Sequence, residues 1–497
     1  MNLTTLLEMI AAGFEDRVLL GPRATGITGG RLRELAHRGA GVLQESSASV
    51  VVFLGGNGPA LPMAMFAASA AGLPFLPINY RLADDQIEEI LGRHEAPFII
   101  AEVPDRVHES AISIDEWVTR CAAHEPITVA ADPDLDDVAV ILMTSGTTGA
   151  PKSALLRHTH LTSYVVGSVE FAGSEETDAT IVSVPPYHIA AVANLLSNLY
   201  SGRRILYLDR FSAEEWLRIV TDEGVTHAMV VPTMLSRIVD LLESTDSMGP
   251  STLRSISYGG AKISAAVLRR ALQRFPDTGF VNAYGLTETS STIAVLTPDD
   301  HRDAHGNPDE TIAKRLGSVG QPVPGIEVQI RDEHGKVLGA GESGELFVRG
   351  EQVSGKYTGI GSVLDDEGWF PTRDIATLDE AGYLFISGRS DDTIIRGGEN
   401  IAPAELEDVL IEHPDVHAVA VVGVEDPNWG QAIVAVVVPA TGVDPDPDEL
   451  REHVRKFLRG SRTPDRVVFR DELPTNATGK LLRREIVADL RDANVER

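Results

Sequence analysis

The sequence has little cysteine and little positive charge. Its 497 residues include one cysteine, Cys121, so the chain alone cannot form an internal disulfide or a thiolate zinc site. Lys and Arg number 43 against 73 Asp and Glu, which gives a net charge of −30. A surface this acidic repels nucleic-acid phosphates and anionic lipid headgroups. The single cysteine leads us to expect a reducing compartment. The acidic charge leads us to expect neither nucleic acid nor a membrane surface as a partner.

Long uninterrupted apolar segments are also missing. Residues 46–80 carry no charge, but four prolines and a cluster of glycines divide them into short pieces. The longest helical piece, residues 63–72, is well short of the ~20 residues that span a bilayer. Residues 1–14 lack the early Lys or Arg of a signal peptide, and Glu8 interrupts their apolar stretch. The sequence predicts a cytoplasmic protein with no membrane span.

Short apolar runs alternate with amphipathic helices over the first 300 residues, a pattern typical of parallel α/β sheets. The predicted strands are 50–54, 98–101, 139–143, 180–184, 204–208, 227–231, 255–258 and 280–283. The predicted helices are 31–43, 83–93, 212–223, 233–243 and 265–275. A length of about 150 residues per domain leaves room for roughly three domains.

Two changes in pattern follow. Glycine-punctuated strands at 327–330, 344–348, 376–378 and 383–386 predict a small β-barrel over residues 316–388. From residue 391, a helix that begins at Pro403, strands 418–424 and 432–438 and a helix over 447–459 predict an α+β domain. The predicted fold is α/β, with a large N-terminal domain (1–390) of two α/β subdomains plus the barrel. A small, mobile C-terminal domain (391–497) follows.

A loop rich in Gly, Ser and Thr follows the strand at 139–143, with the sequence Thr144-Ser-Gly-Thr-Thr-Gly-Ala-Pro-Lys152. Small residues let backbone N–H groups approach phosphate oxygens, hydroxyls donate further hydrogen bonds, and a lysine adds charge. The loop is not a Walker A motif, because Pro151 stands where that motif requires Gly. From these residues alone, a phosphate-binding loop and a flexible surface loop are both open.

This loop resembles the signature loop of the AMP-forming adenylating superfamily, which includes acyl- and aryl-CoA synthetases, adenylation domains and firefly luciferase. Further segments resemble the other motifs of that superfamily, in order: Tyr284-Gly-Leu-Thr-Glu288, Gly368-Trp-Phe-Pro-Thr-Arg-Asp374, Gly388-Arg-Ser-Asp-Asp392, Gly398-Glu-Asn-Ile-Ala-Pro-Ala-Glu405 and Pro474-Thr-Asn-Ala-Thr-Gly-Lys480. The resemblance covers about residues 15–490. It implies that a carboxylate attacks the α-phosphate of ATP, that pyrophosphate leaves, and that a thiol, usually that of CoA, displaces AMP.

The resemblance implies specific phosphate and metal contacts. The residues implied at the β- and γ-phosphates are Thr144, Ser145, Gly146, Thr147, Thr148, Gly149 and Lys152. Thr287 would donate to the α-phosphate, and Glu288 would bind Mg²⁺, since a hard cation that bridges phosphates prefers oxygen ligands. A solvated loop carboxylate is the alternative for Glu288.

The adenine and ribose have their own implied partners. Tyr284 would lie against the base, with the backbone of 259–261 (Gly259, Gly260 and Ala261) along its other face. Asn282, Ala283 and Gly285 flank Tyr284 in the same cofactor-binding set. Asp374 would accept hydrogen bonds from both ribose hydroxyls, and Arg389 would contact ribose or phosphate. Arg373 replaces the usual Gly, so its backbone is either ordinary or strained.

Lys480 is the implied catalytic cation, whose ammonium would bridge the substrate carboxylate and the α-phosphate. The alternative is one basic residue in a solvated tail. The segment around Asp391 would act as a hinge that brings Lys480 in for adenylation and then rotates the domain. Gly397 and Gly398 would line the thiol tunnel, because only glycine lets a ligand pass so close to backbone.

The acyl pocket is less well defined. His188 either lies beside the carboxylate channel as a catalytic residue or is a strand-end histidine satisfied by backbone. Small residues at 190, 191, 193 and 194 suggest room for a chain or ring, and Tyr258 and Ser291 are further candidates. We find no Asp placed to bind an amino acid's ammonium group. Residues 157–160 (Arg-His-Thr-His) resemble a metal dyad but fit a surface helix better.

Four functions remain open. The leading one is an AMP-forming ligase that makes a fatty or aromatic acyl-CoA from the acid, ATP and CoA with Mg²⁺, as in fatty acid metabolism. A second delivers the acyl group to a separate acyl carrier protein, and a third transfers it to an amine or activates an unusual oxyacid. The last is a nucleotide-binding scaffold without activity. The acid and the oligomeric state, a homodimer among them, are not specified by the sequence.

Overall fold

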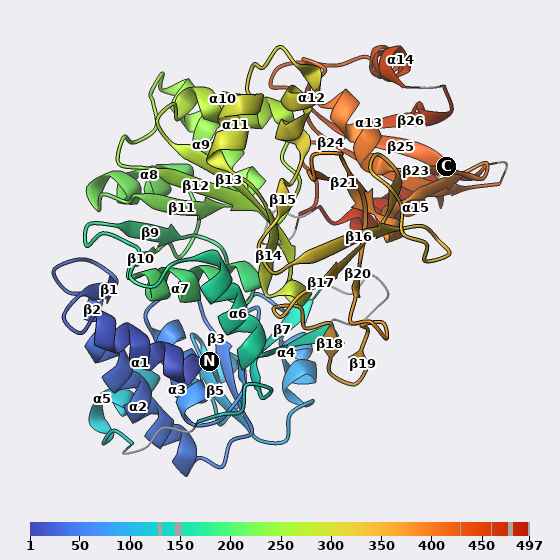
Figure 1. The fold of residues 1–497 in the computed structure, drawn as a ribbon. Helices are drawn as coiled ribbons and strands as arrows, with labels where there is room; N and C mark the ends of the chain where they lie inside the picture. The colour runs from blue at the N-terminus through green and yellow to red at the C-terminus, as the bar shows by residue number, and fades with distance from the viewer. Residues whose placement is uncertain (128–131, 145–151, 428, 459, 476–480, 496–497) are drawn as a thin grey trace.

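The computed structural model describes residues 1–127, 132–144, 152–427, 429–458, 460–475 and 481–495 (Figure 1). A first sheet has nine strands in the order β15-β14-β13-β12-β11-β9-β10-β1-β2. Its strands are β1 (Val18–Leu20), β2 (Ile27–Thr28), β9 (Ala179–Val182), β10 (Arg204–Tyr207), β11 (His227–Val230), β12 (Ser255–Gly259), β13 (Gly279–Leu286), β14 (Ser291–Leu296) and β15 (Gln321–Pro322). Strands β9 to β13 pair in parallel, as predicted.

A second sheet has eight strands in the order β19-β18-β8-β7-β4-β3-β5-β6. Its strands are β3 (Val50–Leu54), β4 (Phe75–Pro77), β5 (Pro97–Ala101), β6 (Ile112–Ser113), β7 (Val138–Thr144), β8 (Lys152–Arg157), β18 (Lys356–Tyr357) and β19 (Gly361–Ser362). The middle strands pair in parallel, whereas β7, β8, β18 and β19 pair antiparallel. The eight strands predicted from apolar runs are all present in these two sheets.

Helices cover the sheets and separate them. They are α1 (Leu3–Gly13), α2 (Gly29–Glu45), α3 (Ala60–Ala70), α4 (Asp84–Leu91), α5 (Ile114–Ala123), α6 (His158–Ser168), α7 (Ile189–Ser201), α8 (Ala213–Asp222), α9 (Pro232–Ser244), α10 (Ala265–Arg274), α11 (Pro298–Ala304) and α12 (Glu310–Ala313). Polar side chains begin several of them: Ser264, for example, accepts a hydrogen bond from the Val267 N–H at the start of α10.

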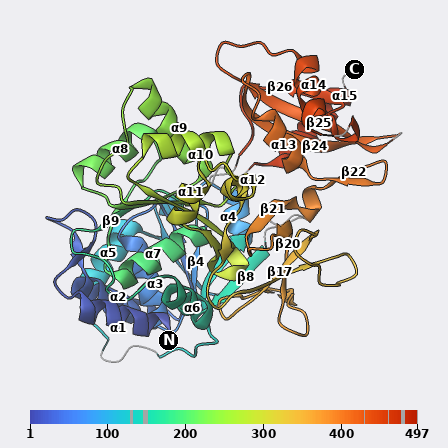
Figure 2. The same cartoon turned by 45° about the horizontal axis from the view of Figure 1, so that its top comes forward.

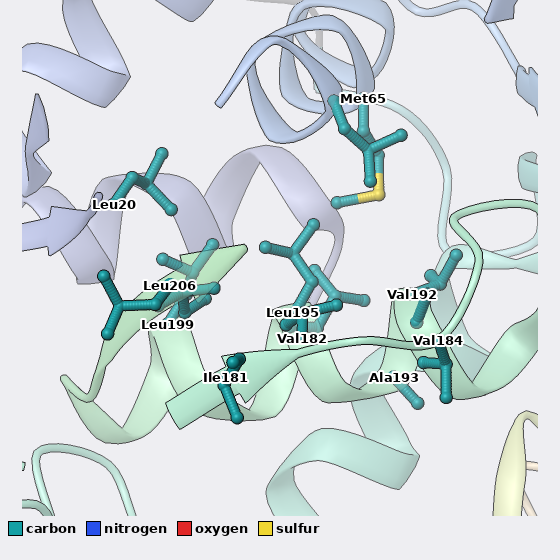
Figure 3. Close-up of a cluster of buried hydrophobic side chains, with 14 of the residues drawn as sticks. Leu20, Met65, Ile181, Val182, Val184, Val192, Ala193, Leu195, Leu199 and Leu206 are labelled. Atoms are coloured by element: carbon teal, nitrogen blue, oxygen red, sulfur yellow. The ribbon is translucent and has the colours of Figure 1, made fainter. Parts of the chain in front are cut away.

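One hydrophobic core joins the two sheets, because helices packed on each sheet contribute to the same cluster. Figure 3 shows Leu195 and Leu199 of α7 beside Val182 of β9, with Met65 of α3 close by. Helix α7 packs on the first sheet and α3 on the second. This shared core fixes the two α/β halves relative to each other, and so fixes the edges at which their loops meet.

The region predicted as a barrel has a different arrangement. Its main strands form a four-stranded antiparallel sheet, β16 (Glu327–Arg331), β17 (Ser343–Arg349), β20 (Phe370–Leu378) and β21 (Leu384–Arg389). Strand β15 joins the first large sheet, and β18 and β19 join the second. The segment therefore connects all three sheets, and a closed barrel stays a prediction.

A small C-terminal domain follows, in orange and red in Figures 1 and 2. Its sheet contains β22 (Ile394–Arg396), β23 (Glu399–Ile401), β24 (Val416–Asp426), β25 (Gly430–Pro439) and β26 (Arg466–Phe469). Its helices are α13 (Pro403–Leu410), α14 (Pro447–Phe457) and α15 (Arg483–Val495). Separate apolar clusters lie on the two faces of this sheet, so the α+β domain has its own core. The boundary at residue 390 stays a prediction.

Ion pairs connect the two domains. Lys262, between β12 and α10, lies 2.6 Å from Asp408 of α13, and Arg269 of α10 lies 3.6 Å from Glu412. Both views place the C-terminal domain beside α12 and β21 (Figures 1 and 2). Among the described residues, no helix is long and apolar enough to cross a bilayer.

Candidate functional site

A cavity of about 280 Å³ lies at the carboxyl ends of parallel strands β9, β10 and β11. In open α/β sheets, ligands bind at this edge. Its lining includes Arg81, Arg210 and Arg237 from the large domain, and Thr475 from the C-terminal domain. The carboxylate of Asp209 also lines the cavity, so arginines exceed carboxylates in its lining, and the cavity is shared between the domains. Thr475 pairs with Leu481 in an isolated antiparallel β-bridge.

Strands β7 and β8 flank the predicted phosphate loop. Thr144 and Lys152 are direct partners across the two strands, and the Thr144 hydroxyl donates to the Lys152 carbonyl oxygen at 3.3 Å. The five other predicted loop residues, 145–149, lie outside the described residues. The structure thus shows both ends of the predicted loop at one paired position of a hairpin.

Tyr357 lies between Glu288 and Lys152 and contacts both side chains. Glu288 is in the short helix η2 (Thr287–Thr289), immediately after β13, and Thr287 is half-buried beside it. The Tyr357 hydroxyl donates to Glu288 Oε1 at 2.6 Å, and the Lys152 ammonium lies 5.6 Å from the centre of the Tyr357 ring. The antiparallel pair Tyr357–Ala154 holds β18 against β8 and so sets this arrangement.

Asp374 is the centre of a second cluster. Its carboxylate accepts a 2.5 Å hydrogen bond from the Tyr284 hydroxyl, and its other oxygen lies 3.1 Å from Nε of Arg389. Thr372, which is buried, contacts both Asp374 and Arg389. Its hydroxyl accepts a hydrogen bond from the Asp374 N–H, and its carbonyl accepts one from the Arg389 guanidinium. Burial and then the Asp374 charge raise the pKa of Tyr284 well above its usual value, so Tyr284 is a neutral donor.

Arg373 occupies the left-handed region of backbone space, with φ of 65°. Its neighbours in β20 bulge out of the ladder, since Glu345 pairs with Ile375 while Phe347 pairs with Pro371. The Arg373 side chain is 61% exposed and lies 3.9 Å from Glu345. Of the two alternatives predicted for this position, the strained backbone is therefore the observed one.

Glycines shape the edge predicted to hold the base. A Cβ at Gly259 would lie 2.2 Å from the Ala283 carbonyl oxygen, and a Cβ at Gly285 would lie 1.7 Å from the Ser291 carbonyl oxygen. Gly260 has φ of 83° and precedes Ala261. These glycines let β12, β13 and β14 approach closely, which is reason enough for them without a ligand. Beside them, the Asn282 amide donates to the Ser318 carbonyl.

His188 is the N-cap residue of helix α7, six residues after β9 ends, so of the two alternatives for this residue the strand-end position is not the observed one. Burial lowers the pKa of its imidazole to about 4, which keeps the ring neutral at pH 7. Within the described part of the chain, its buried Nε2 has no hydrogen-bond partner. Backbone does not satisfy this nitrogen, which favours the interpretation that it faces a ligand.

Other acyl-pocket candidates have structural partners. Tyr258 is fully buried and its hydroxyl lies 2.8 Å from Nε2 of His301, so it does not face an acyl group. Ala191 and Ala193 belong to the hydrophobic core. His158 and His160 lie on α6, as expected, but are buried rather than at the surface. The described ranges contain no group of three or more His, Cys, Asp or Glu that could hold a metal.

The C-terminal candidates are only partly described. Gly397 and Gly398 form the turn between β22 and β23, with φ of 58° and 83°, and Gly397 packs on Trp429. The expected tunnel position of this turn stays a prediction. Lys480 lies outside the described residues.

The sequence analysis did not predict the three arginines of the cavity (Arg81, Arg210 and Arg237), nor Tyr357, Thr372 and Thr475. Thr372 and Thr475 belong to motifs that the sequence shows, so their contacts at the site could have been predicted from those motifs. Tyr357 is in a two-residue strand, 69 residues from Glu288, and no periodicity marks it.

Comparison with known proteins agrees with this geometry. The profile described as AMP-binding enzyme matches residues 7–358, and that of the AMP-binding enzyme C-terminal domain matches 405–480. A feruloyl-CoA synthase of Amycolatopsis sp is 36% identical over 88% of each chain. A fatty acid–[acyl-carrier-protein] ligase of Streptomyces coeruleorubidus is 30% identical over 88% of this chain and 86% of the relative.

The o-succinylbenzoate CoA synthetase of Bacillus subtilis with its acyl-adenylate superposes with a TM-score of 0.84 at 28% identity, covering 97% of both chains. The same synthetase is also known with ATP and magnesium ion, at a TM-score of 0.82 and 26% identity, covering 97% of this chain and 98% of that one.

Proposed function

The chain belongs to the AMP-binding enzyme family, and we propose that it is an AMP-forming ligase that joins an aromatic carboxylic acid to CoA. ATP-dependent activation of an acid and transfer to CoA agree with its CoA-ligase relatives. The observation that carries the proposal is the pair of clusters at one sheet edge, Tyr284–Asp374–Arg389 and Glu288–Tyr357–Lys152. They provide acceptors for ribose hydroxyls and a carboxylate beside a cation for phosphates.

The Asp374 cluster fits the ribose. A carboxylate offers about four lone-pair sites, so Asp374 can accept ribose hydroxyls as well as Tyr284. The Arg389 guanidinium lies beside the buried carboxylate and balances its negative charge. The Tyr284 ring then stands next to the ribose, consistent with a place against the adenine, and Gly259, Gly260 and Ala261 border the same edge.

The Glu288 cluster fits Mg²⁺ at the phosphates. Tyr357 is the one partner of the Glu288 carboxylate among the described residues, so Oε2 is available to a metal. Magnesium is usually held by one or two carboxylates plus substrate phosphates, so a larger ligand cluster is not needed. When bound, the ion would neutralise phosphate charge. Lys152 and the loop residues Thr144 to Gly149 would surround the β- and γ-phosphates, and Thr287 the α-phosphate.

The reaction proposed needs no enzyme nucleophile. A carboxylate oxygen of the acid attacks the α-phosphorus, a bond from that oxygen to phosphorus forms, and the bond to the pyrophosphate oxygen breaks. The Lys480 ammonium would stabilise charge at the α-phosphate during this step. The CoA thiol then loses its proton and attacks the acyl carbon. A carbon–sulfur bond forms, and AMP leaves as the carbon–oxygen bond breaks.

Domain rotation is proposed between the two steps. The ion pairs Lys262–Asp408 and Arg269–Glu412 are largely exposed, so they stabilise the observed arrangement only weakly. Rotation near Asp391 would remove Lys480 and bring Gly397 and Gly398 to the thiol path. We place the domain boundary at 390/391 on this basis.

The similarity to known relatives supports the choice of acid, and the charge of the cavity supports the choice of acceptor. An aromatic acid is supported by the feruloyl-CoA synthase and o-succinylbenzoate CoA synthetase. Arg81, Arg210 and Arg237 at the shared cavity suit a polyanionic acceptor such as CoA more than a neutral amine. His188, neutral and without a partner, is proposed at the acyl channel. We propose the cytoplasm as the location, because ATP and CoA are consumed there.

A second candidate is delivery of a fatty acyl group to a separate carrier protein, favoured by the similarity to the carrier-protein ligase. Pyrophosphate release across a panel of aromatic and fatty acids, with and without CoA, tests both. The proposal expects release with an aromatic acid and formation of its CoA thioester. Adenylate formation from a fatty acid with little CoA ester would favour the second candidate instead. If none of the acids caused pyrophosphate release, both candidates would be contradicted.

A further inference from the structure

Tyr357 contacts two groups assigned above to the phosphate site. Its hydroxyl donates to Glu288 Oε1 at 2.6 Å, and its ring faces the Lys152 ammonium 5.6 Å away. The side chain is 9% exposed. It therefore connects the carboxylate from the first large sheet with the lysine from the second.

The Tyr357 hydroxyl is the donor in this hydrogen bond, because a carboxylate oxygen has no proton to give and can only accept. A charge-assisted bond of this kind is short and about twice as strong as a neutral one, so it holds the carboxylate in one orientation.

The backbone near Glu288 is held independently of this bond. The Ser354 N–H donates to the Glu288 carbonyl at 2.8 Å, and the Gln352 amide donates to the Thr289 and Thr292 carbonyls at 2.9 and 2.8 Å. The local fold therefore does not need the Tyr357 hydroxyl. The hydroxyl contacts the Glu288 side chain only, so its effect falls on the direction of the carboxylate.

We propose that Tyr357 is a positioning residue that orients the Glu288 carboxylate for the Mg²⁺ of MgATP and keeps Lys152 at the same phosphates. The inference rests on the proposed function, since Glu288 and Lys152 are assigned there. Tyr357 touches neither metal nor nucleotide in this account, and acts through the two side chains it contacts.

Calorimetric titration of ATP into the full chain, with Mg²⁺ and with a chelator, tests this without turnover. For Tyr357→Phe we expect the Mg²⁺-dependent gain in ATP affinity to fall about tenfold, as for a lost hydrogen bond to a charged group, with metal-free ATP binding unchanged. Tyr357→Leu also removes the ring from Lys152, so it should weaken metal-free ATP binding too.

Tyr383→Phe is the matched control, because the Tyr383 hydroxyl makes the same kind of bond to Asp300 at 2.5 Å, away from these clusters. It should bind MgATP like the unaltered protein. A double variant adds a stricter check: in a Glu288→Gln background, Tyr357→Phe should cause no further loss. Melting temperatures without ligand report whether each variant is folded.

The outcomes separate the two levels of the account. Unaltered Mg²⁺-dependent binding in Tyr357→Phe, or tighter binding because the hydroxyl had competed with the metal, overturns the inference and leaves the proposed function intact. A further loss in the Glu288→Gln background also overturns it. If the unaltered protein binds ATP no better with Mg²⁺, the proposed function itself fails.

Discussion

The hydroxyl of Tyr284 donates a hydrogen bond of 2.5 Å to the carboxylate of Asp374, 90 residues further along the chain. Tyr284 lies in strand β13 of the first large sheet, and Asp374 lies in β20 of the four-stranded sheet. The bond thus joins two sheets at the proposed nucleotide site. The residue assigned to the base and the residue assigned to the ribose form one unit, so a change at either should affect ATP binding.

Replacement of Asp374 by Asn should raise the KM for ATP by about 10- to 100-fold, with a smaller effect on kcat. The amide keeps the shape but loses the charged acceptor, and a hydrogen bond to a charged group contributes about 1.5–3 kcal/mol. Initial rates of pyrophosphate release against ATP concentration give both constants. Asp300→Asn is the matched control, since Asp300 accepts the same kind of bond from Tyr383. An equal rise in the control would indicate general destabilisation.

Lys480→Ala should abolish adenylate formation but still convert a supplied acyl-adenylate and CoA to thioester. The charge that Lys480 neutralises develops in the first step only, and loss of such a donor costs about 10²–10³ in rate. Pyrophosphate release and thioester formation from synthetic adenylate are measured separately. Lys456→Ala, on α14 of the same domain, should change neither. Equal loss of both half-reactions would contradict the proposed domain rotation.

Arg373→Gly should stabilise the protein relative to Arg373→Ala. Both variants remove the charge, but only Gly relieves the backbone at φ of 65°. The left-handed conformation costs an L-residue roughly 1–2 kcal/mol, and the greater unfolded-state freedom of Gly offsets part of this. Thermal unfolding of the two variants measures the difference. A Gly variant no more stable than the Ala variant would show that the bulge in β20 relaxes around any residue.

Lys262→Glu should slow adenylation by a few-fold at low salt, because two carboxylates would then face each other between the domains. The added change Asp408→Lys should restore the rate. Exposed ion pairs contribute about 0–1 kcal/mol, and salt screens them, so the effect should fade at high ionic strength. Rates that do not depend on salt, or a double variant without recovery, would argue against this contact during adenylation.

Stability should fall as pH decreases from about 6.5 towards 5, before most carboxylates are protonated. Burial lowers the pKa of His158, His160 and His227 to about 4 each, so the folded state binds fewer protons than the unfolded state in this range. Their contribution is complete above the unfolded pKa of about 6.5 and is lost as pH falls towards the folded value. Melting temperature against pH should be shallower for His158→Gln and unchanged for His334→Gln, which is exposed. Identical slopes would contradict the assignment.

The sequence predicted the parallel sheets well because buried strands are short continuous apolar runs bounded by turn residues. It missed β18, since two residues carry no periodicity, and with it the contact between Tyr357 and Glu288. Tertiary pairing with β8, not local preference, creates that strand.

At the site, Asp374 and Arg389 come from neighbouring motifs and lie 3.1 Å apart. The sequence did not show that Tyr357 contacts Glu288, or that Thr372 contacts both Asp374 and Arg389. The left-handed conformation of Arg373 depends on the bulge opposite Glu345, which a sequence does not show. The small residues Ala191 and Ala193 were assigned to the acyl pocket because composition cannot tell the pocket face of a helix from its core face. The structure places both residues in the shared core.

Product analysis tests the central claim most directly. With ATP, Mg²⁺, CoA and an accepted acid, the account predicts one AMP and one pyrophosphate for each acyl-CoA thioester formed. Chromatographic quantification of the nucleotides gives the ratio. ADP and inorganic phosphate in place of AMP and pyrophosphate would contradict the account, since cleavage at the α-phosphorus is what every assigned residue serves.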